Sequence, residues 1–249
     1  SGGFISLWCD KRDSKNDIYA QLTNDNLSIT SPTSNDTLNG SSNQNIIWSL
    51  RSDEVIFDHL SLQVSETEGD GYPYSIADHV PPDQLSRSWS APGLNGNEVT
   101  IRIQARNAKD SVVCTYYSDS FTMDSEPPLE FSLISPAHND TVEKIITFEW
   151  ESTTDNLTGL SHYQLFIDGS LYLDNLQEST YTLTPAQALS TGSHTWTIRA
   201  VDKAGVYCEA AANSIEVVYD NTPPDDFHLT VPENNSWTTA DNPLFSWES

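Results

Sequence analysis

The stretch Lys144–Ser152, KIITFEWES, contains the pattern from which the fold follows. Its apolar residues alternate with polar ones, so Ile146, Phe148 and Trp150 share one face of an extended chain. The polar residues between them take the other face. An alternation with a period of two is typical of a strand that has one buried and one solvent-facing side, as in antiparallel sheets.

This strand occurs three times in the chain. An earlier copy, NQNIIWSL, spans Asn43–Leu50, and a later copy, NPLFSWES, spans Asn242–Ser249. The tryptophans of successive copies lie about a hundred residues apart, and repetition at a fixed period is typical of tandem units. The connecting segment repeats as well, because MDSEPPLEFSL at Met123–Leu133 matches YDNTPPDDFHL at Tyr219–Leu229. These coincident features predict tandem domains joined by stiff Pro-Pro linkers.

About seven short alternating strands per repeat, separated by turn residues, predict immunoglobulin-like β-sandwiches. The only helix-like stretch, TPAQALSTG at Thr184–Gly192, is interpreted as a loop or a single turn. The predicted domains are residues 1–25 as the tail of a preceding β domain, 26–125 as a first sandwich, 126–222 as a second sandwich, and 223–249 as the opening strands of a third, incomplete sandwich.

The second repeat resembles a known family. The order of Pro136, Trp150 and Tyr163, followed by HTWTIRAVDKAG at His194–Gly205 and then YDNTPP, resembles the fibronectin type III-like and Ig-like repeats of bacterial secreted and surface proteins. The resemblance covers about residues 27–249. It implies an all-β chain of tandem immunoglobulin-like (fibronectin type III-like) antiparallel β-sandwiches at an extracellular or cell-surface location.

The N-terminal stretch has a different resemblance. ISLWCDKRDSKNDIYAQLT, at Ile5–Thr23, is similar to the last hairpin of a blade in secreted, TolB-like β-propellers. In that interpretation DKRDSKN forms the turn of the hairpin, and the chain begins at the tail of another domain.

The charge of the chain excludes several classes of partner. Lys and Arg number 11 against 36 Asp and Glu, which gives a formal net charge of −25. Such a field repels nucleic acid, so no nucleic-acid partner is expected, and it suits a cationic partner such as calcium. No stretch of eighteen apolar residues is present, so no membrane insertion of this segment is expected.

No catalytic signature is present, and no enzymatic activity is predicted for this segment. The serine-hydrolase elbow, the H-E-x-x-H helix, the P-loop and the C-x-x-C pair are all missing from the sequence. Cys114 and Cys208 occupy matching places in the two repeats, so a disulfide between them is not expected.

Acidic clusters are the candidates for metal ligation, because Ca²⁺ prefers six to eight oxygen ligands. The candidates fall in the turn SETEGDG and in the two linkers, and they are Glu66, Glu68, Asp70, Asp124, Glu126, Asp220, Asp225 and Asp226, with Glu130 beside them. A merely acidic turn and linker on an acidic protein is the alternative.

Histidines and aromatic residues provide two further candidate sites. His59 and His162 occupy equivalent places before two strands, and His162 could face His194 as a metal pair or be an ordinary strand histidine. Tyr72 and Trp89, with Tyr74, lie in Gly69–Gly96, a stretch that the second repeat largely lacks. They would form a sugar-binding platform or pack onto their own sandwich.

The predicted function is non-catalytic: structural, adhesion or spacer modules within a larger secreted or cell-surface multidomain protein. The expected partners are other domains of the same parent chain, a cell-surface protein or glycan, and further copies of the chain. One alternative is that the modules are accessories of a secreted hydrolase or protease whose catalytic domain lies outside this segment. Another is that the unfinished third sandwich accepts a strand from a second copy, so that filaments form.

Overall fold

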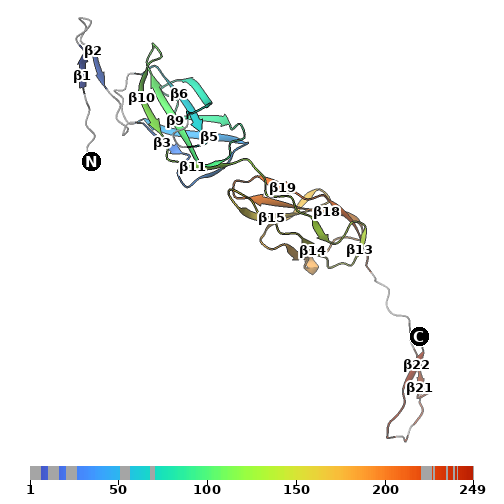
Figure 1. Ribbon diagram of the computed structural model, residues 1–249. Coiled ribbons are helices and arrows are strands. Elements are labelled where there is room, and N and C mark those ends of the chain that lie inside the picture. The colour runs from blue at the N-terminus through green and yellow to red at the C-terminus, as the bar shows by residue number, and fades with distance from the viewer. Residues whose placement is uncertain are drawn as a thin grey trace.

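The computed structural model describes residues 7–10, 17–20, 27–50, 57–67, 71–219, 226, 228–233, 235–237, 239 and 241–248. Nearly all regular structure in these residues is β-strand, and two β-sandwiches follow one another along the chain (Figure 1). The one helical element described is a 3-10 turn, η1 (Pro185–Gln187), which confirms the single turn predicted for Thr184–Gly192. The predicted all-β sandwich fold is therefore confirmed.

The first sandwich packs a three-stranded sheet against a six-stranded one. The smaller sheet has the order β3 (Leu27–Ser31), β5 (Asn43–Leu50), β8 (Ser86–Ser90). The larger sheet has the order β4 (Thr37–Asn39), β11 (Phe121–Asp124), β9 (Gly96–Arg106), β6 (His59–Ser65), β7 (Tyr74–Val80), and β10 (Val112–Tyr117) also pairs with β9.

The second sandwich repeats this arrangement strand for strand. Its smaller sheet has the order β12 (Leu133–Ser135), β14 (Thr147–Trp150), β17 (Thr180–Thr182). Its larger sheet has the order β13 (Asp140–Val142), β20 (Asn213–Val217), β18 (Gly192–Asp202), β15 (Leu160–Ile167), β16 (Ser170–Leu176), and β19 (Tyr207–Glu209) also pairs with β18.

The strand pairing is antiparallel with one exception in each sandwich. The short strands β4 and β13 run parallel to β11 and β20, respectively. Each short strand follows a strand of the opposite sheet, after the cis peptides Ser31–Pro32 and Ser135–Pro136. The first segment of each repeat thus crosses from one sheet to the other, which the alternation of residues alone did not reveal.

Each sandwich has its own hydrophobic core. The alternation predicted for KIITFEWES is confirmed, because Ile146, Phe148 and Trp150 are each at most 2% exposed. Phe148 on β14 contacts Trp196 on β18, with ring centroids 4.9 Å apart, so this pair joins the two sheets. Trp48 occupies the place of Trp150 in the first sandwich and is also buried.

The aromatic residues of Gly69–Gly96 belong to the first sandwich. Strands β7 and β8 occupy the places of β16 and β17, so this stretch is not an insertion absent from the second repeat. Tyr72 is 7% exposed and its hydroxyl lies 3.0 Å from Thr100 Oγ1, while Tyr74 and Trp89 pack against the first core. Packing onto their own sandwich, rather than a sugar platform, accounts for all three aromatics.

Two strand pairs flank the sandwiches. β1 (Leu7–Asp10) and β2 (Asp17–Ala20) form an antiparallel hairpin. β21 (His228–Val231) pairs with β22 (Ser246–Glu248) in the antiparallel manner of β12 and β14.

Within the described part of the chain, no helix has the length and apolar character that a membrane span requires.

Candidate metal centre

The first component of the site is Asp124, at the joint between the sandwiches. Strand β11 ends at this residue, and its side chain is fully buried. Asp124 Oδ1 accepts a hydrogen bond from the Glu126 N–H at 3.0 Å, and Oδ2 accepts one from the Thr158 hydroxyl at 2.8 Å. Because Thr158 belongs to the second sandwich, the second hydrogen bond spans the joint.

The second component is Asp155, in the loop between β14 and β15. Its Oδ1 accepts hydrogen bonds from three successive backbone N–H groups, those of Leu157, Thr158 and Gly159, at 3.0, 2.7 and 2.9 Å. Partial burial alone would raise the pKa of Asp155, but these donors outweigh it and the pKa is lowered from its ordinary value. The loop therefore holds Asp155 as a carboxylate.

The Asp155 loop is fastened to both the core and the linker. The Thr153 N–H donates to the Tyr163 hydroxyl at 2.9 Å, and the Thr153 hydroxyl donates to the Leu129 carbonyl at 2.6 Å. The Leu129 N–H donates back to the Thr154 carbonyl at 3.0 Å. The segment that follows Asp124 is thereby bound to the second sandwich before its first strand begins.

The third component is Asp202, at the C-terminal end of β18. It is 2% exposed, and its Oδ1 accepts a hydrogen bond from the Val206 N–H at 2.8 Å. Its Oδ2 is buried and has no hydrogen-bond partner among the described residues. Burial raises the pKa of Asp202, and the negative charges of Asp124 and Asp155 raise it further against the opposing effect of the Val206 N–H.

The three carboxylates converge on one point. Oxygens of Asp124, Asp155 and Asp202 lie within 4.8 Å of one another. Oxygens that ligate one Ca²⁺ at about 2.3–2.6 Å can be about 5 Å apart, so this spacing fits a shared Ca²⁺ ion. Buried like charges at this separation destabilise each other unless a cation compensates them. The spacing and the negative charge of the group are therefore compatible with a bound cation.

One of the linker acids proposed from the sequence lies in this group. Asp124 belongs to the group, whereas Glu126 is exposed and contributes only its N–H. Glu130 and Asp226 are exposed, and Glu66 lies in the first sandwich, where its Oε1 accepts the Asn95 N–H at 3.2 Å. Four other candidates lie outside the described residues: Glu68, Asp70, Asp220 and Asp225.

Sequence reasoning missed Asp155 and Asp202. A signal for Asp202 was present, because Trp196, Ile198, Ala200 and Asp202 continue one inward-facing alternation that ends on a carboxylate. A charged residue at an inward-facing strand position requires a partner. No comparable signal distinguishes Asp155 from the many other loop acids of this chain.

The structure does not bring His162 and His194 together, as the alternative of a metal pair would require. The strand register places His162 opposite Val201, while His194 lies near the other end of β18. His162 Nε2 is 3.2 Å from Asp174 Oδ1, and His194 Nδ1 is 2.7 Å from Asp168 Oδ2. Each histidine therefore pairs with its own aspartate.

The second sandwich matches a known family of domains. Residues 130–198 match the family model of the bacterial Ig domain. The resemblance to bacterial Ig-like and fibronectin type III-like tandem modules is thereby confirmed. The hairpin of β1 and β2 is present, but nothing supports its assignment to a TolB-like propeller.

Solved structures with a similar fold include other tandem modules. The Clostridium thermocellum CbhA fibronectin(III)-like modules are 14% identical with a TM-score of 0.44, over 77% of this chain and 92% of that one. The FN1–FN3 domains of chicken CNTN1 are 13% identical with a TM-score of 0.43, over 74% of this chain and 65% of that one. No curated protein matches the sequence.

Bacterial Ig-like modules are typical of multidomain secreted or surface proteins, and they are typically non-catalytic. A shared fold alone does not specify an activity, so the function has to be argued from the residues at the joint.

Proposed function

We propose that this chain is a non-catalytic spacer segment of a larger secreted or cell-surface protein, and that Ca²⁺ fixes the joint between its sandwiches. In this proposal Asp124 supplies a ligand from the first sandwich, and Asp155 and Asp202 supply ligands from the second. The ion would tie the two modules together and stiffen the connection further.

The unpartnered Oδ2 of Asp202 is the observation that carries this proposal. A buried carboxylate oxygen without a donor is rare, because its desolvation is not compensated. The other two carboxylates already accept hydrogen bonds that hold them toward Asp202. Linker backbone on the first sandwich's side is equally constrained, since the Gly40 N–H donates to the Asp124 carbonyl at 2.7 Å.

A spacer requires a defined direction from one module to the next. Pro127 and Pro128 restrict the linker backbone, and Leu129 is hydrogen-bonded to the second sandwich in both directions. The only side-chain hydrogen bond described across the joint is the one between Thr158 and Asp124. Ca²⁺ would add ionic contacts to this single side-chain hydrogen bond.

The test combines Ca²⁺ titration calorimetry with small-angle scattering of the chain of residues 1–249. We expect one Ca²⁺ per joint, and a narrower distribution of inter-module distances with Ca²⁺ than with EGTA. Asp155→Asn should abolish both effects, whereas Glu126→Gln, a change of an exposed neighbouring carboxylate, should preserve them. Identical scattering profiles with and without Ca²⁺ would overturn the spacer-stiffening role, and absence of Ca²⁺ binding would overturn the metal assignment itself.

A further inference from the structure

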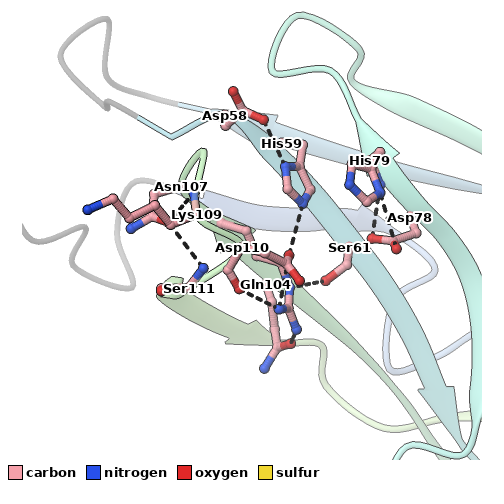
Figure 2. A network of polar contacts seen from close by, with 11 residues as sticks. Asp58, His59, Ser61, Asp78, His79, Gln104, Asn107, Lys109, Asp110 and Ser111 are labelled. Carbon is pink, nitrogen blue, oxygen red and sulfur yellow. Dashed lines mark hydrogen bonds and ion pairs between the residues drawn. The ribbon is translucent and has the colours of Figure 1, made fainter.

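A second group of side chains that could ligate a metal ion lies in the first sandwich (Figure 2). His59 begins β6, and Asp78 and His79 lie on the neighbouring strand β7. Ligand atoms of these three residues lie within 4.8 Å of one another. Asp110, in the turn between β9 and β10, brings its Oδ1 to 3.4 Å from His59 Nε2.

His59 has one satisfied and one unsatisfied ring nitrogen. The residue is 5% exposed, and its Nδ1 lies 3.0 Å from Asp58 Oδ2. Its Nε2 is buried and makes no hydrogen bond to the described residues. Metal-binding histidines commonly donate one ring N–H to a carboxylate, so that the other nitrogen presents its lone pair to the ion. Asp58 and His59 have this arrangement, with Nε2 directed toward Asp110 (Figure 2).

The second sandwich provides an internal comparison. His162 occupies the place of His59, and Asp174 the place of Asp78. The place of His79 is taken by Asn175, and both have a left-handed backbone, with φ of 52° and 61°. The fold therefore forms without a second histidine here, and Asn adopts this conformation more readily than most residues.

The fourth group is also particular to the first sandwich. Gly205 stands at the place of Asp110 in the equivalent turn, and both have positive φ, 81° and 61°. Beside His59, the first repeat thus carries an imidazole and a carboxylate that the second repeat lacks. Neither difference is explained by packing, because the side chains of His79 and Asp110 are 71% and 66% exposed.

We propose that His59, Asp78 and His79, with Asp110, bind a divalent first-row transition metal ion, represented here by Zn²⁺. Two imidazoles and two carboxylates form the mixed nitrogen and oxygen set that suits a four-coordinate Zn²⁺. Ca²⁺ is a poor match, because it prefers six to eight oxygen ligands. A polar cavity of about 170 Å³, lined in part by Asp78 and Asp110, provides room beside these side chains.

Metal binding requires one side chain to move. The rings of His59 and His79 are stacked, with centroids 4.2 Å apart and planes 11° apart, so their in-plane lone pairs do not meet. His79 would have to turn out of the stack and leave its contact with Asp78 Oδ2 at 3.2 Å. Its exposure means that no core packing opposes this rotation. Arg106 Nη1 lies 3.3 Å from Asp110 Oδ1 and would compete with the ion for that carboxylate.

The test is calorimetric titration of tag-free, metal-stripped chain with ZnCl₂ in excess CaCl₂, which keeps the joint carboxylates from capturing Zn²⁺. We expect one Zn²⁺ per chain and a rise in the melting temperature of the first sandwich by at least about 5 °C near saturation. His79→Asn installs the residue of the second sandwich at the same backbone angle. It should fold normally and weaken Zn²⁺ binding at least tenfold.

His162→Asn is the control, because it removes the histidine that stands at the place of His59 in the second sandwich. Zn²⁺ affinity should be unchanged in this variant. The proposal would be overturned by the absence of saturable Zn²⁺ binding to the unsubstituted chain, or by an affinity in His79→Asn equal to that of the unsubstituted chain. A tenfold loss in His162→Asn instead of His79→Asn would place the ion in the other sandwich and overturn it equally.

Discussion

Replacing Asp202 by asparagine should change the stability of the second sandwich in opposite directions with and without calcium. Asp202 Oδ1 would keep its role as acceptor for the Val206 N–H, since an asparagine carbonyl accepts the same bond. The new amide N–H groups would lie near the Asp124 and Asp155 carboxylates, within about 5 Å of them. Asn107 already stands at the equivalent place in the first sandwich, where its Oδ1 accepts the Ser111 N–H at 3.1 Å.

The magnitude follows from the spacing of the carboxylates. Two unit charges 4.8 Å apart repel by about 3 kcal/mol at an effective dielectric constant of about 20. Asparagine carries no charge, and solvent at the half-buried Asp155 screens part of this repulsion, so the substitution should recover about 1–2 kcal/mol. For a domain of this size that corresponds to a rise in melting temperature of roughly 5–10 °C. Ca²⁺ at about 100 times its dissociation constant should stabilise the parent by about 2.7 kcal/mol and the variant hardly at all.

Differential scanning calorimetry of the chain of residues 1–249, in EGTA and in CaCl₂, measures both effects. The Asp202→Asn variant should melt above the parent in EGTA and below it in CaCl₂. Glu126→Gln should follow the parent in both buffers, because the Glu126 side chain is exposed and outside the group. Our reasoning is refuted if the variant is less stable than the parent in EGTA, or if Ca²⁺ stabilises both proteins equally.

Three further predictions concern the second sandwich. Asp168→Asn should lower stability by roughly 1 kcal/mol at pH 5 and less at pH 8 in urea denaturation; a pH-independent loss would contradict this. Partial burial would raise the Asp168 pKa, but the Thr195 N–H and His194 outweigh it and lower the pKa from 3.8. Asp168 in turn raises the His194 pKa from 6.5. The pair therefore stabilises the folded state most between pH 3.8 and pH 6.5. Phe148→Ala should cost about 3–5 kcal/mol and lower only one of two calorimetric transitions, because the cores share no residues; a shift of both would refute independent cores. Tyr163→Phe should lower the stability by about 1–3 kcal/mol, because it leaves the Thr153 N–H unpaired. It should also weaken Ca²⁺ binding, because Thr153 holds the loop that carries Asp155. An unchanged Ca²⁺ affinity would mean that this hydrogen bond does not position Asp155.

The Asp202→Asn variant also distinguishes the proposed Zn²⁺ site from the proposed Ca²⁺ site. Zn²⁺ binding at His59 and Ca²⁺ binding at the joint use different ligands in different places, so their effects on stability should add. Asp202→Asn should therefore leave the Zn²⁺ affinity unchanged, as measured by calorimetric titration. A loss of Zn²⁺ binding in Asp202→Asn would mean that the joint carboxylates are the Zn²⁺ ligands.

The fold class, the tandem repeat and much of the core could be predicted from the amino-acid sequence. The reason is physical: side chains alternate across a strand with a period of two, so Ile146, Phe148 and Trp150 reveal a buried face without any knowledge of their partners. The repeat then assigns the same role to Trp48 about a hundred residues earlier. What the alternation did not reveal is the parallel pairing of β4 and β13, because a three-residue strand is too short to show its direction.

Only the tertiary structure decided which polar residues meet. Asp124 ends one sandwich, Asp155 lies in a loop of the next, and Asp202 ends a strand, so no local pattern links them. His59, Asp78 and Asp110 are likewise brought together by the pairing of β6 with β7 and β9. Strand register sets which loops share an end of a sheet, and that register depends on the whole core rather than on the residues of the site.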